Sequence, residues 1–216
     1  MDLDSIIAEA FKLYMPQDKY EITELAIFVK SHIDNRQSDG YNILEIGTKY
    51  GGTFYIWNEL NPHGINISID MSDGGIHGGI PDEEMDRRDL WFYERFENCH
   101  FIRGDSHSLQ THGDTFRLLD KWNTPDLVGK LEKVDFLFID GDHTYEGVKK
   151  DFEMYSPFVR IGGIVALHDI NDSERHRSRN VNVSRFWKEI VESGKYETIE
   201  FNSNLDWAGI GVIVKN

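Results

Sequence analysis

The stretch VDFLFID, residues 134–140, most constrains what this chain can fold into. Its apolar run is nearly continuous, so it lacks the alternation expected of a strand with one face in water. A strand of this kind belongs in the middle of a parallel sheet that is covered on both faces. Parallel strands need long crossover connections, which are usually helices. The stretch therefore predicts an α/β architecture.

Helix-like and strand-like segments alternate along the rest of the chain. The apolar spacing typical of helices occurs at 2–14, 20–34, 51–60, 90–96, 113–122, 145–156 and 184–193. Strand-like stretches occur at 42–47, 65–70, 100–104, 134–140, 162–169, 196–201 and 208–215. This alternation predicts a single doubly wound α/β domain over residues 1–216. The helices within 1–36 are expected to pack on its core or to form an oligomer contact.

The charge balance restricts the partners. Lys and Arg number 23 against 38 Asp and Glu, a formal net charge of −15. Nucleic acid and anionic membranes need a basic face, so neither is expected as a partner. The N-terminal stretch is acidic where a signal peptide is basic, and no apolar run reaches the roughly 20 residues of a membrane span. With Cys99 as the single cysteine, these features predict a cytoplasmic protein.

A glycine-rich turn, GTKYGG, follows the strand-like stretch 42–47. Its Gly47 and Gly51 are spaced as G-x-x-x-G, which is neither the G-x-G-x-x-G of dinucleotide enzymes nor a P-loop. Either the backbone there approaches a ligand too closely for a Cβ atom, or the segment is an ordinary tight turn. Asp70, at the end of the next strand, favours a nucleoside-bearing ligand because an acid at this place can bind ribose hydroxyls. Asp105 and Ser106, in RGDSHS, fit equally well the far end of such a ligand and a helix N-cap.

The stretch FIDGDHTYEGVKKD is the most informative for chemistry. Asp140, Asp142 and His143 follow a core strand, where buried charge is costly unless it is paired or bound to a metal. A histidine with an ordinary pKa near 6.5 suits a general base, although His143 could also be a solvated loop residue or a helix cap. We favour a catalytic role, because open α/β sheets place their sites at the carboxyl ends of strands.

His168 and Asp169 end the next strand and are expected to lie near Asp140. Together the three side chains can hold a divalent cation: carboxylates suit Mg²⁺, and a histidine leans toward Mn²⁺, Fe²⁺ or Zn²⁺. The alternative is a hydrogen-bonded group without a metal.

Two loops, 71–81 and 171–183, are expected to fold over this edge of the sheet. Three arginines in the second loop can receive an anionic substrate, although such a run is more often a solvated loop; they are Arg175, Arg177 and Arg179.

Together, these stretches resemble class I S-adenosylmethionine-dependent methyltransferases, in particular the branch that groups cephalosporin-hydroxylase-like proteins with macrocin-type sugar O-methyltransferases. That branch shows EIGT…GG, SID before a glycine-rich loop, GDSH, FIDGDHxYEGV..D and GGxxxxHD. This chain has EIGTKYGG, SIDMSDGGIHGG, RGDSHS, FIDGDHTYEGVKKD and GGIVALHD in the same order, within about Glu21 to Val214. The resemblance implies a Rossmann-like, mostly parallel seven-stranded sheet with an antiparallel C-terminal strand and helices on both faces.

The resemblance also implies roles for individual residues. Those that it places around S-adenosylmethionine are Glu45, Gly47, Thr48 and Gly51 at the methionine part, Asp70 at the ribose, Asp105 and Ser106 at the adenine, and Asp140. Metal-dependent relatives use the aspartate that opens DGDH, here Asp140, with two acids ending the next strand. Here those positions are His168 and Asp169, so the sequence departs from the family at the first, and the implied cation is Mg²⁺ or Mn²⁺. The histidine of DGDH, here His143, is the implied base.

These observations predict an O-methyltransferase that acts on a hydroxyl group of a small molecule or sugar, with S-adenosylmethionine as methyl donor. The resemblance allows a homo-oligomer assembled through the N-terminal helices. Two alternatives stay open: a nucleotide-dependent oxidoreductase or hydroxylase, and a cofactor-binding relative without catalysis. The missing G-x-G-x-x-G counts against the first, and the presence of Asp140, His143 and Asp169 counts against the second.

Overall fold

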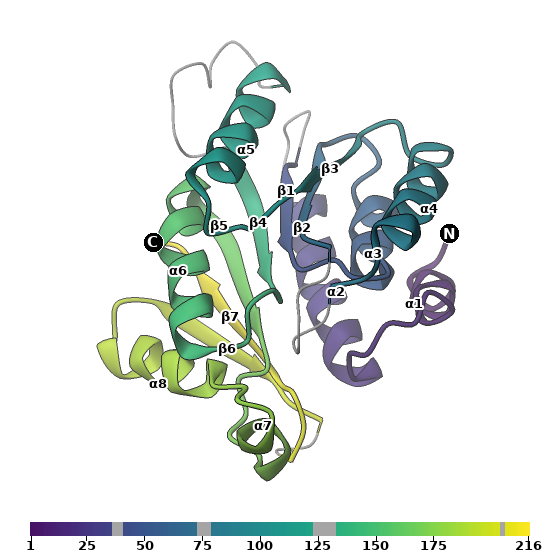
Figure 1. Cartoon of the computed structure of the whole chain (residues 1–216). Helices are drawn as coiled ribbons and strands as arrows, with labels where there is room; N and C mark the ends of the chain where they lie inside the picture. The colour runs from purple at the N-terminus through teal and green to yellow at the C-terminus, as the bar shows by residue number, and fades with distance from the viewer. Residues whose placement is uncertain (36–40, 73–78, 123–132, 204–205) are drawn as a thin grey trace.

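The computed structural model describes residues 1–35, 41–72, 79–122, 133–203 and 206–216, and it places a central sheet between two layers of helices (Figure 1). Among these residues, seven strands pair in the order β3-β2-β1-β4-β5-β7-β6. The strands are β1 Ile43–Ile46, β2 Asn66–Asp70, β3 Cys99–Arg103, β4 Val134–Ile139, β5 Val159–His168, β6 Glu197–Phe201 and β7 Ile210–Val214. Only β7 is antiparallel to its neighbours, β5 and β6. The predicted sheet, including its antiparallel C-terminal strand, is confirmed.

The helices occupy most of the predicted segments. They are α1 Leu3–Phe11, α2 Lys19–Asp34, α3 Gly52–Leu60, α4 Asp82–Tyr93, α5 Leu109–Trp122, α6 Tyr145–Tyr155, the 3₁₀ helix Ser156–Phe158, α7 Glu174–Ser178 and α8 Val183–Ser193. Within the described chain, each helix is too short or too polar to cross a lipid bilayer.

The segment 171–183 was expected to be a loop, and this expectation is wrong in part because α7 lies within it. Ser173 begins this helix by accepting a hydrogen bond from the backbone N–H of His176 at 3.1 Å. A helix of five residues leaves no room for a repeating apolar pattern, so periodicity could not reveal it.

The central strand β4 packs against both helix layers. Phe136 and Phe138 belong to the cluster formed with α1 to α4, whereas Leu137 and Ile139 belong to the cluster formed with α5, α6 and α8. This division follows from the two-residue period of a strand. The N-terminal helices contribute buried apolar side chains to the first cluster, so they pack on the core of the domain.

The strand order creates a crevice at one edge of the sheet. From β1 the chain moves outward to β2 and β3, and it then returns to β4 on the other side of β1. The connections after β1 and β4 therefore leave the sheet in opposite directions. Ligands bind at such switch points, beyond the carboxyl ends of the parallel strands.

Candidate active site

A cavity of about 560 Å³ lies at the carboxyl ends of the parallel strands. This volume falls within the range of small-molecule sites. The ends of β1, β2 and β5 and the loops after β1, β2, β3, β4 and β5 form much of its wall. The predicted residues that line it are Gly47, Thr48, Asp70, Asp105, Ser106, Asp140, His143, His168 and Asp169.

The two predicted glycines are required by packing within the protein. Gly47 has a φ of +88°, and a Cβ atom there would lie 2.1 Å from the carbonyl oxygen of Asp140. Gly51 has a φ of +91°, and its Cβ atom would lie 2.6 Å from the ring of Phe92. Packing against the residues after β4 and against α4 therefore restricts these two positions to glycine, and the expected contact with a ligand stays a prediction. Gly47 lines the cavity, whereas Gly51 is not among the lining residues.

Glu45 is not among the residues that line the cavity. Its side chain is fully buried, and Oε2 accepts a hydrogen bond from Trp57 Nε1 at 2.6 Å. Burial raises the pKa of the Glu45 carboxyl group to about 8. The structure thus gives Glu45 a role in fixing α3 on β1, and its expected contact with the cofactor stays a prediction. Its neighbour Thr48 does line the cavity, where its hydroxyl group contacts that of Ser68.

Asp70 lines the cavity at the end of β2 and is held by neighbours on two sides. Oδ2 accepts hydrogen bonds from Lys49 N at 2.9 Å and from Arg88 Nη1 at 2.7 Å, and Oδ1 accepts one from Met71 N at 3.0 Å. Burial raises the pKa of Asp70, and the charge of Arg88 opposes that rise. Arg88, which holds this carboxylate, was missed by sequence reasoning. In the sequence, Arg88 is distinguished only as a basic residue in the polar helix that precedes β3.

Asp105 and Ser106 line the cavity beyond β3. Asp105 Oδ1 accepts a hydrogen bond from His107 N at 2.8 Å, and the Ser106 carbonyl accepts one from the Tyr155 hydroxyl at 2.7 Å. Neither side chain caps α5, because Ser108 Oγ accepts the hydrogen bond from Thr111 N at 3.0 Å. The N-cap explanation left open for these two residues is therefore excluded.

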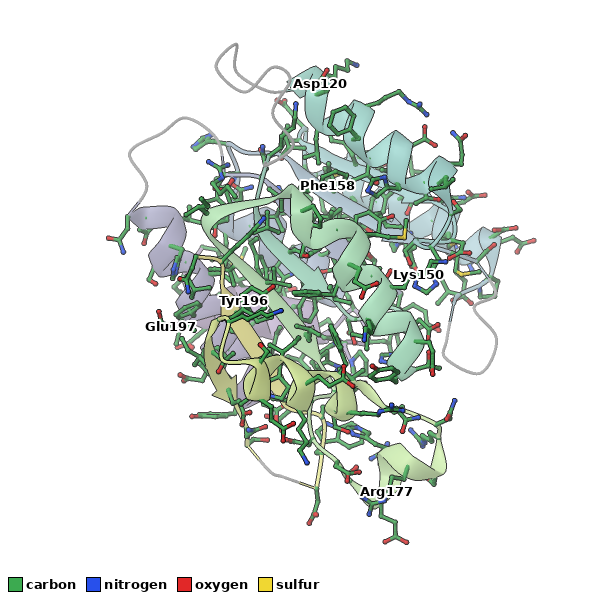
Figure 2. All side chains as sticks on the ribbon, turned by 90° about the vertical axis from the view of Figure 1, so that its left-hand side faces the viewer. Asp120, Lys150, Phe158, Arg177, Tyr196 and Glu197 are labelled. Atoms are coloured by element: carbon green, nitrogen blue, oxygen red, sulfur yellow. The ribbon has the colours of Figure 1, made fainter. Side chains whose placement is uncertain are left out.

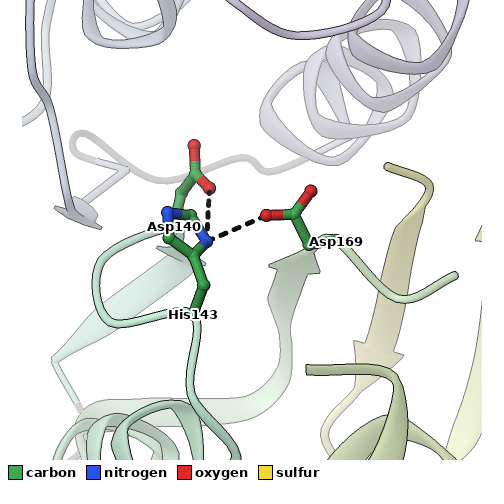
Figure 3. Close-up of side chains that lie close together, drawn as sticks. All are labelled: Asp140, His143 and Asp169. Atoms are coloured by element: carbon green, nitrogen blue, oxygen red, sulfur yellow. Dashed lines mark ion pairs between the residues drawn. The ribbon is translucent and has the colours of Figure 1, made fainter. Parts of the chain in front are cut away.

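His143 lies between the carboxylates of Asp140 and Asp169 (Figure 3). Its Nδ1 atom is 2.9 Å from Asp169 Oδ2 and 3.9 Å from Asp140 Oδ1. One ligand atom from each of these residues lies within 4.8 Å of the others, an arrangement that can hold a metal ion. Burial opposes the charged imidazole, but the hydrogen bond to Asp169 and the charge of Asp140 raise the pKa of His143.

His168 lies beside the same two carboxylates. Its Nδ1 atom is 3.0 Å from Asp140 Oδ1 and 3.4 Å from Asp169 Oδ1. Although its burial favours the neutral ring, these carboxylates raise the pKa of His168 well above its usual value. Asp169 has a φ of +64°, an uncommon value for a residue with a side chain, and its carboxylate faces three imidazoles. Burial would raise the pKa of Asp169, but these imidazoles lower it well below the ordinary range.

Two more residues of this cluster were missed by sequence reasoning. His176, on α7, places Nε2 3.3 Å from Asp169 Oδ1 and Nδ1 2.7 Å from the Asn171 carbonyl. Gln17, in the connection between α1 and α2, donates a hydrogen bond from Nε2 to Asp140 Oδ2 at 2.7 Å. A histidine within a charged segment was the only signal for His176, and Gln17 had none.

The donor chemistry of this cluster fits a divalent cation. Asp140 Oδ1 is buried, accepts no hydrogen bond from the described residues and lies 3.0 Å from His168 Nδ1, so this oxygen keeps lone pairs for an ion. A ligand set of carboxylate oxygens and imidazole nitrogens suits Mn²⁺ and similar ions better than it suits Mg²⁺, which prefers oxygen ligands alone.

The loop 71–81 was expected to fold over this edge of the sheet. Its residues 73–78 lie outside the described residues, while Met71 and Gly79 line the cavity.

A family model and several known proteins match parts of this chain. A model of the methyltransferase domain family matches residues 44–170. An uncharacterized protein of Acanthamoeba polyphaga mimivirus is 35% identical over 68 residues, which are 32% of this chain and 30% of that protein. The chain spans less than a third of the length of the first curated relatives that it matches.

Solved structures share the fold over the whole chain. A Staphylococcus aureus protein named as a caffeoyl-CoA O-methyltransferase has a TM-score of 0.64 and 17% identity, covering 100% of this chain and 93% of that one. The MycE methyltransferase of the mycinamycin biosynthetic pathway, solved in complex with Mg, SAH and mycinamycin VI, has a TM-score of 0.61 and 15% identity, covering 100% and 54%.

Proposed function

The chain belongs to the methyltransferase domain family, and from this premise we propose that it transfers a methyl group from S-adenosylmethionine to a hydroxyl oxygen of a small molecule or sugar. The observation that carries the oxygen specificity is His143, an imidazole held by Asp169 at 2.9 Å in the wall of the cavity. A hydroxyl group is a poor nucleophile until a base removes its proton. The shared motifs further support a place in the macrocin-type branch.

His143 is the proposed general base. Asp169 Oδ2 can accept only from a protonated Nδ1, so the Nε2 atom is the one that takes the proton of the acceptor. Asp169 thereby fixes the tautomer and the orientation of the ring, as an acid does in other catalytic pairs. Because the pKa of His143 is raised, its neutral, proton-accepting form is populated on the alkaline side of the usual histidine range.

The ends of β1, β2 and β3 are the proposed binding surface for S-adenosylmethionine. When bound, this cofactor supplies an activated methyl group on a sulfonium sulfur. Gly47 and Thr48 would lie along its methionine part, Asp70 would bind the ribose, and Asp105 with Ser106 would contact the adenine. All five line the cavity, and Arg88 holds Asp70 in place.

A divalent cation, Mg²⁺ or Mn²⁺, is proposed at Asp140, Asp169 and His168. Such an ion would lower the pKa of a hydroxyl group that binds beside it. Gln17 holds the second oxygen of Asp140, which leaves Oδ1 directed to this position. We also propose that the protein acts without nucleic acid or membrane partners, in line with its net charge of −15. A homo-oligomer is proposed as its form of assembly.

Cofactor binding tests this proposal most directly. A ligand that binds the folded chain raises the melting temperature, and at a given concentration a tighter ligand raises it further. We expect S-adenosylmethionine and S-adenosylhomocysteine (SAH) to raise it, NAD to leave it unchanged, and Asp70→Asn to weaken SAH binding. Asp114→Asn, on the exposed side of α5, is the matched control and should bind SAH like the parent chain.

Two results, one from this screen and one from a methyl-transfer assay, would favour the rival functions. Stabilisation by NAD without any response to SAH would point to an oxidoreductase. SAH binding without methyl transfer to any member of a broad panel of hydroxyl compounds would point to a cofactor-binding protein without catalysis.

A further inference from the structure

Two arginines line the half of the cavity that the proposed cofactor does not use. Asp70 and Asp105 lie at the ends of β2 and β3, on one side of the sheet order. Arg175, Arg179 and Trp207 line the cavity on the other side, after β5 and before β7. The sheet order thus separates a cofactor half from an opposite half, which is open to the methyl acceptor.

Arg175 is held in a conformation suited to binding an oxyanion. Its guanidinium carbon lies 3.8 Å from the centroid of the Trp207 ring. A guanidinium group stacked in this way keeps its N–H donors at its edge, where they can meet a carboxylate or phosphate in pairs. Both Arg175 and Arg179 are exposed, and no carboxylate of the described residues forms an ion pair with either.

Arg177 on the same helix has a different environment. Its Nη1 atom forms an ion pair with Asp172 Oδ1 at 2.6 Å, and it does not line the cavity. Figure 2 shows this residue at the outer edge of the molecule. Helix α7 therefore directs Arg175 toward Trp207 in the cavity wall, whereas Arg177, two residues later, lies outside the cavity with its charge paired to Asp172.

The negative charge of the protein indicates what these two arginines can bind. The chain has a net charge of −15, and most carboxylates in the cavity already face a cationic group. Asp70 pairs with Arg88, and Asp140 and Asp169 face imidazoles. An anion entering such a protein is repelled unless cations without carboxylate partners receive it. In the acceptor half of the cavity, Arg175 and Arg179 are these cations.

We propose that Arg175 and Arg179 bind an oxyanion group, a carboxylate or a phosphate, on the methyl acceptor. The acceptor is then a hydroxyl compound that carries such a group within reach of the hydroxyl to be methylated. The term acceptor rests on the proposed function, whereas the anion site stands on the side chains alone.

Inorganic phosphate and acetate are suitable probes for this site. Each is titrated at constant ionic strength, with and without SAH, while the melting temperature is followed. The proteins are the parent chain, the double variant Arg175→Gln/Arg179→Gln, and the control Arg177→Gln. We expect a saturable rise in the parent and the control, and an apparent Kd at least roughly tenfold weaker in the double variant, because charged hydrogen bonds are lost. Saturation by phosphate alone identifies a phosphorylated acceptor, and saturation by acetate identifies a carboxylate.

Equal shifts in all three proteins, or shifts that never saturate, would overturn the proposal, since both describe a general salt effect. The two proposals can fail separately. Loss of every SAH response with anion binding intact defeats the methyltransferase assignment and leaves the anion site. SAH binding without a specific anion response defeats the anion site alone.

Discussion

Arg88 Nη1 donates a hydrogen bond to Asp70 Oδ2 at 2.7 Å, and the two side chains are 4% and 10% exposed. The same nitrogen donates to the Lys49 carbonyl at 2.6 Å. One buried guanidinium group therefore joins the glycine turn after β1 to the acid at the end of β2. The geometry of the proposed ribose site depends on a helix that does not itself line the cavity.

Replacing this guanidinium should destabilise the fold. Arg88→Gln leaves Asp70 buried without its cation, and we expect the free energy of unfolding to fall by roughly 3 kcal/mol. Urea denaturation measures the change. Arg87→Gln, an exposed neighbour on α4, should stay within about 0.5 kcal/mol of the parent. Equal losses in the two variants would show that the pair with Asp70 is unimportant.

A side chain at Gly47 should be costly for two reasons, strain at positive φ and collision with the Asp140 carbonyl. Gly194→Ala isolates the first, because Gly194 has a φ of +60° and no atom within 4 Å of the added Cβ. We expect about 1 kcal/mol of destabilisation at Gly194 and several times more, or no folded protein, at Gly47. Denaturation midpoints measure both, and similar values for the two would contradict the close approach of β4 to this turn.

The buried carboxyl group of Glu45 should make stability depend on pH. Its pKa is about 8 when folded, against about 4.3 when unfolded. Between these two pH values the folded chain holds a proton that the unfolded chain has lost. The contribution of Glu45 to the free energy of unfolding is therefore at its full value below the unfolded pKa, and it decreases as the pH rises toward 8. Glu45→Gln should flatten this fall between pH 5 and 8, by an amount on the order of a few kcal/mol. Glu83→Gln, at an exposed position, should keep the parent slope in urea titrations.

Removing the proposed base should separate catalysis from cofactor binding. His143→Ala should lower kcat for methyl transfer by about 100-fold or more and leave the Kd for SAH within about twofold, since the ring contacts Asp169 and not the proposed cofactor surface. His63→Ala, exposed before β2, is the control. Undiminished turnover in His143→Ala would remove this residue from the mechanism.

The mixed ligand set predicts a preference among cations. Titration calorimetry on chelator-treated protein should show tighter binding of Mn²⁺ than of Mg²⁺, by about tenfold. Asp140→Asn should abolish the signal. Asp142→Asn should retain it, because the Asp142 carboxylate is engaged with Thr144 N at 2.9 Å. No heat with either ion would take the cation out of the proposed mechanism.

Much of the scaffold could be predicted because its signals are local. The apolar run at 134–140 requires cover on both faces, and strands of one parallel sheet end at one edge. For this reason Asp140, His143 and Asp169 could be expected to meet. The antiparallel last strand was implied by resemblance, since the pattern of a short strand does not give its direction.

The missed residues depend on tertiary packing. Gln17 reaches Asp140 only because α1 packs on α3 and directs the following connection across the strand ends. His176 reaches Asp169 through a five-residue helix without apolar spacing. Gly51 was expected at a ligand, but its restriction comes from Phe92, on a helix whose position the local sequence does not define.

The family match ends at residue 170 and begins at 44, whereas Gln17, Arg175, His176 and Trp207 all lie outside it. The shared region thus carries the strand ends and the proposed base, and the flanking segments contribute further side chains to the wall of the cavity. Under the proposed function, changes in the two flanks would alter the acceptor side of the cavity and leave the strand ends and His143 unchanged.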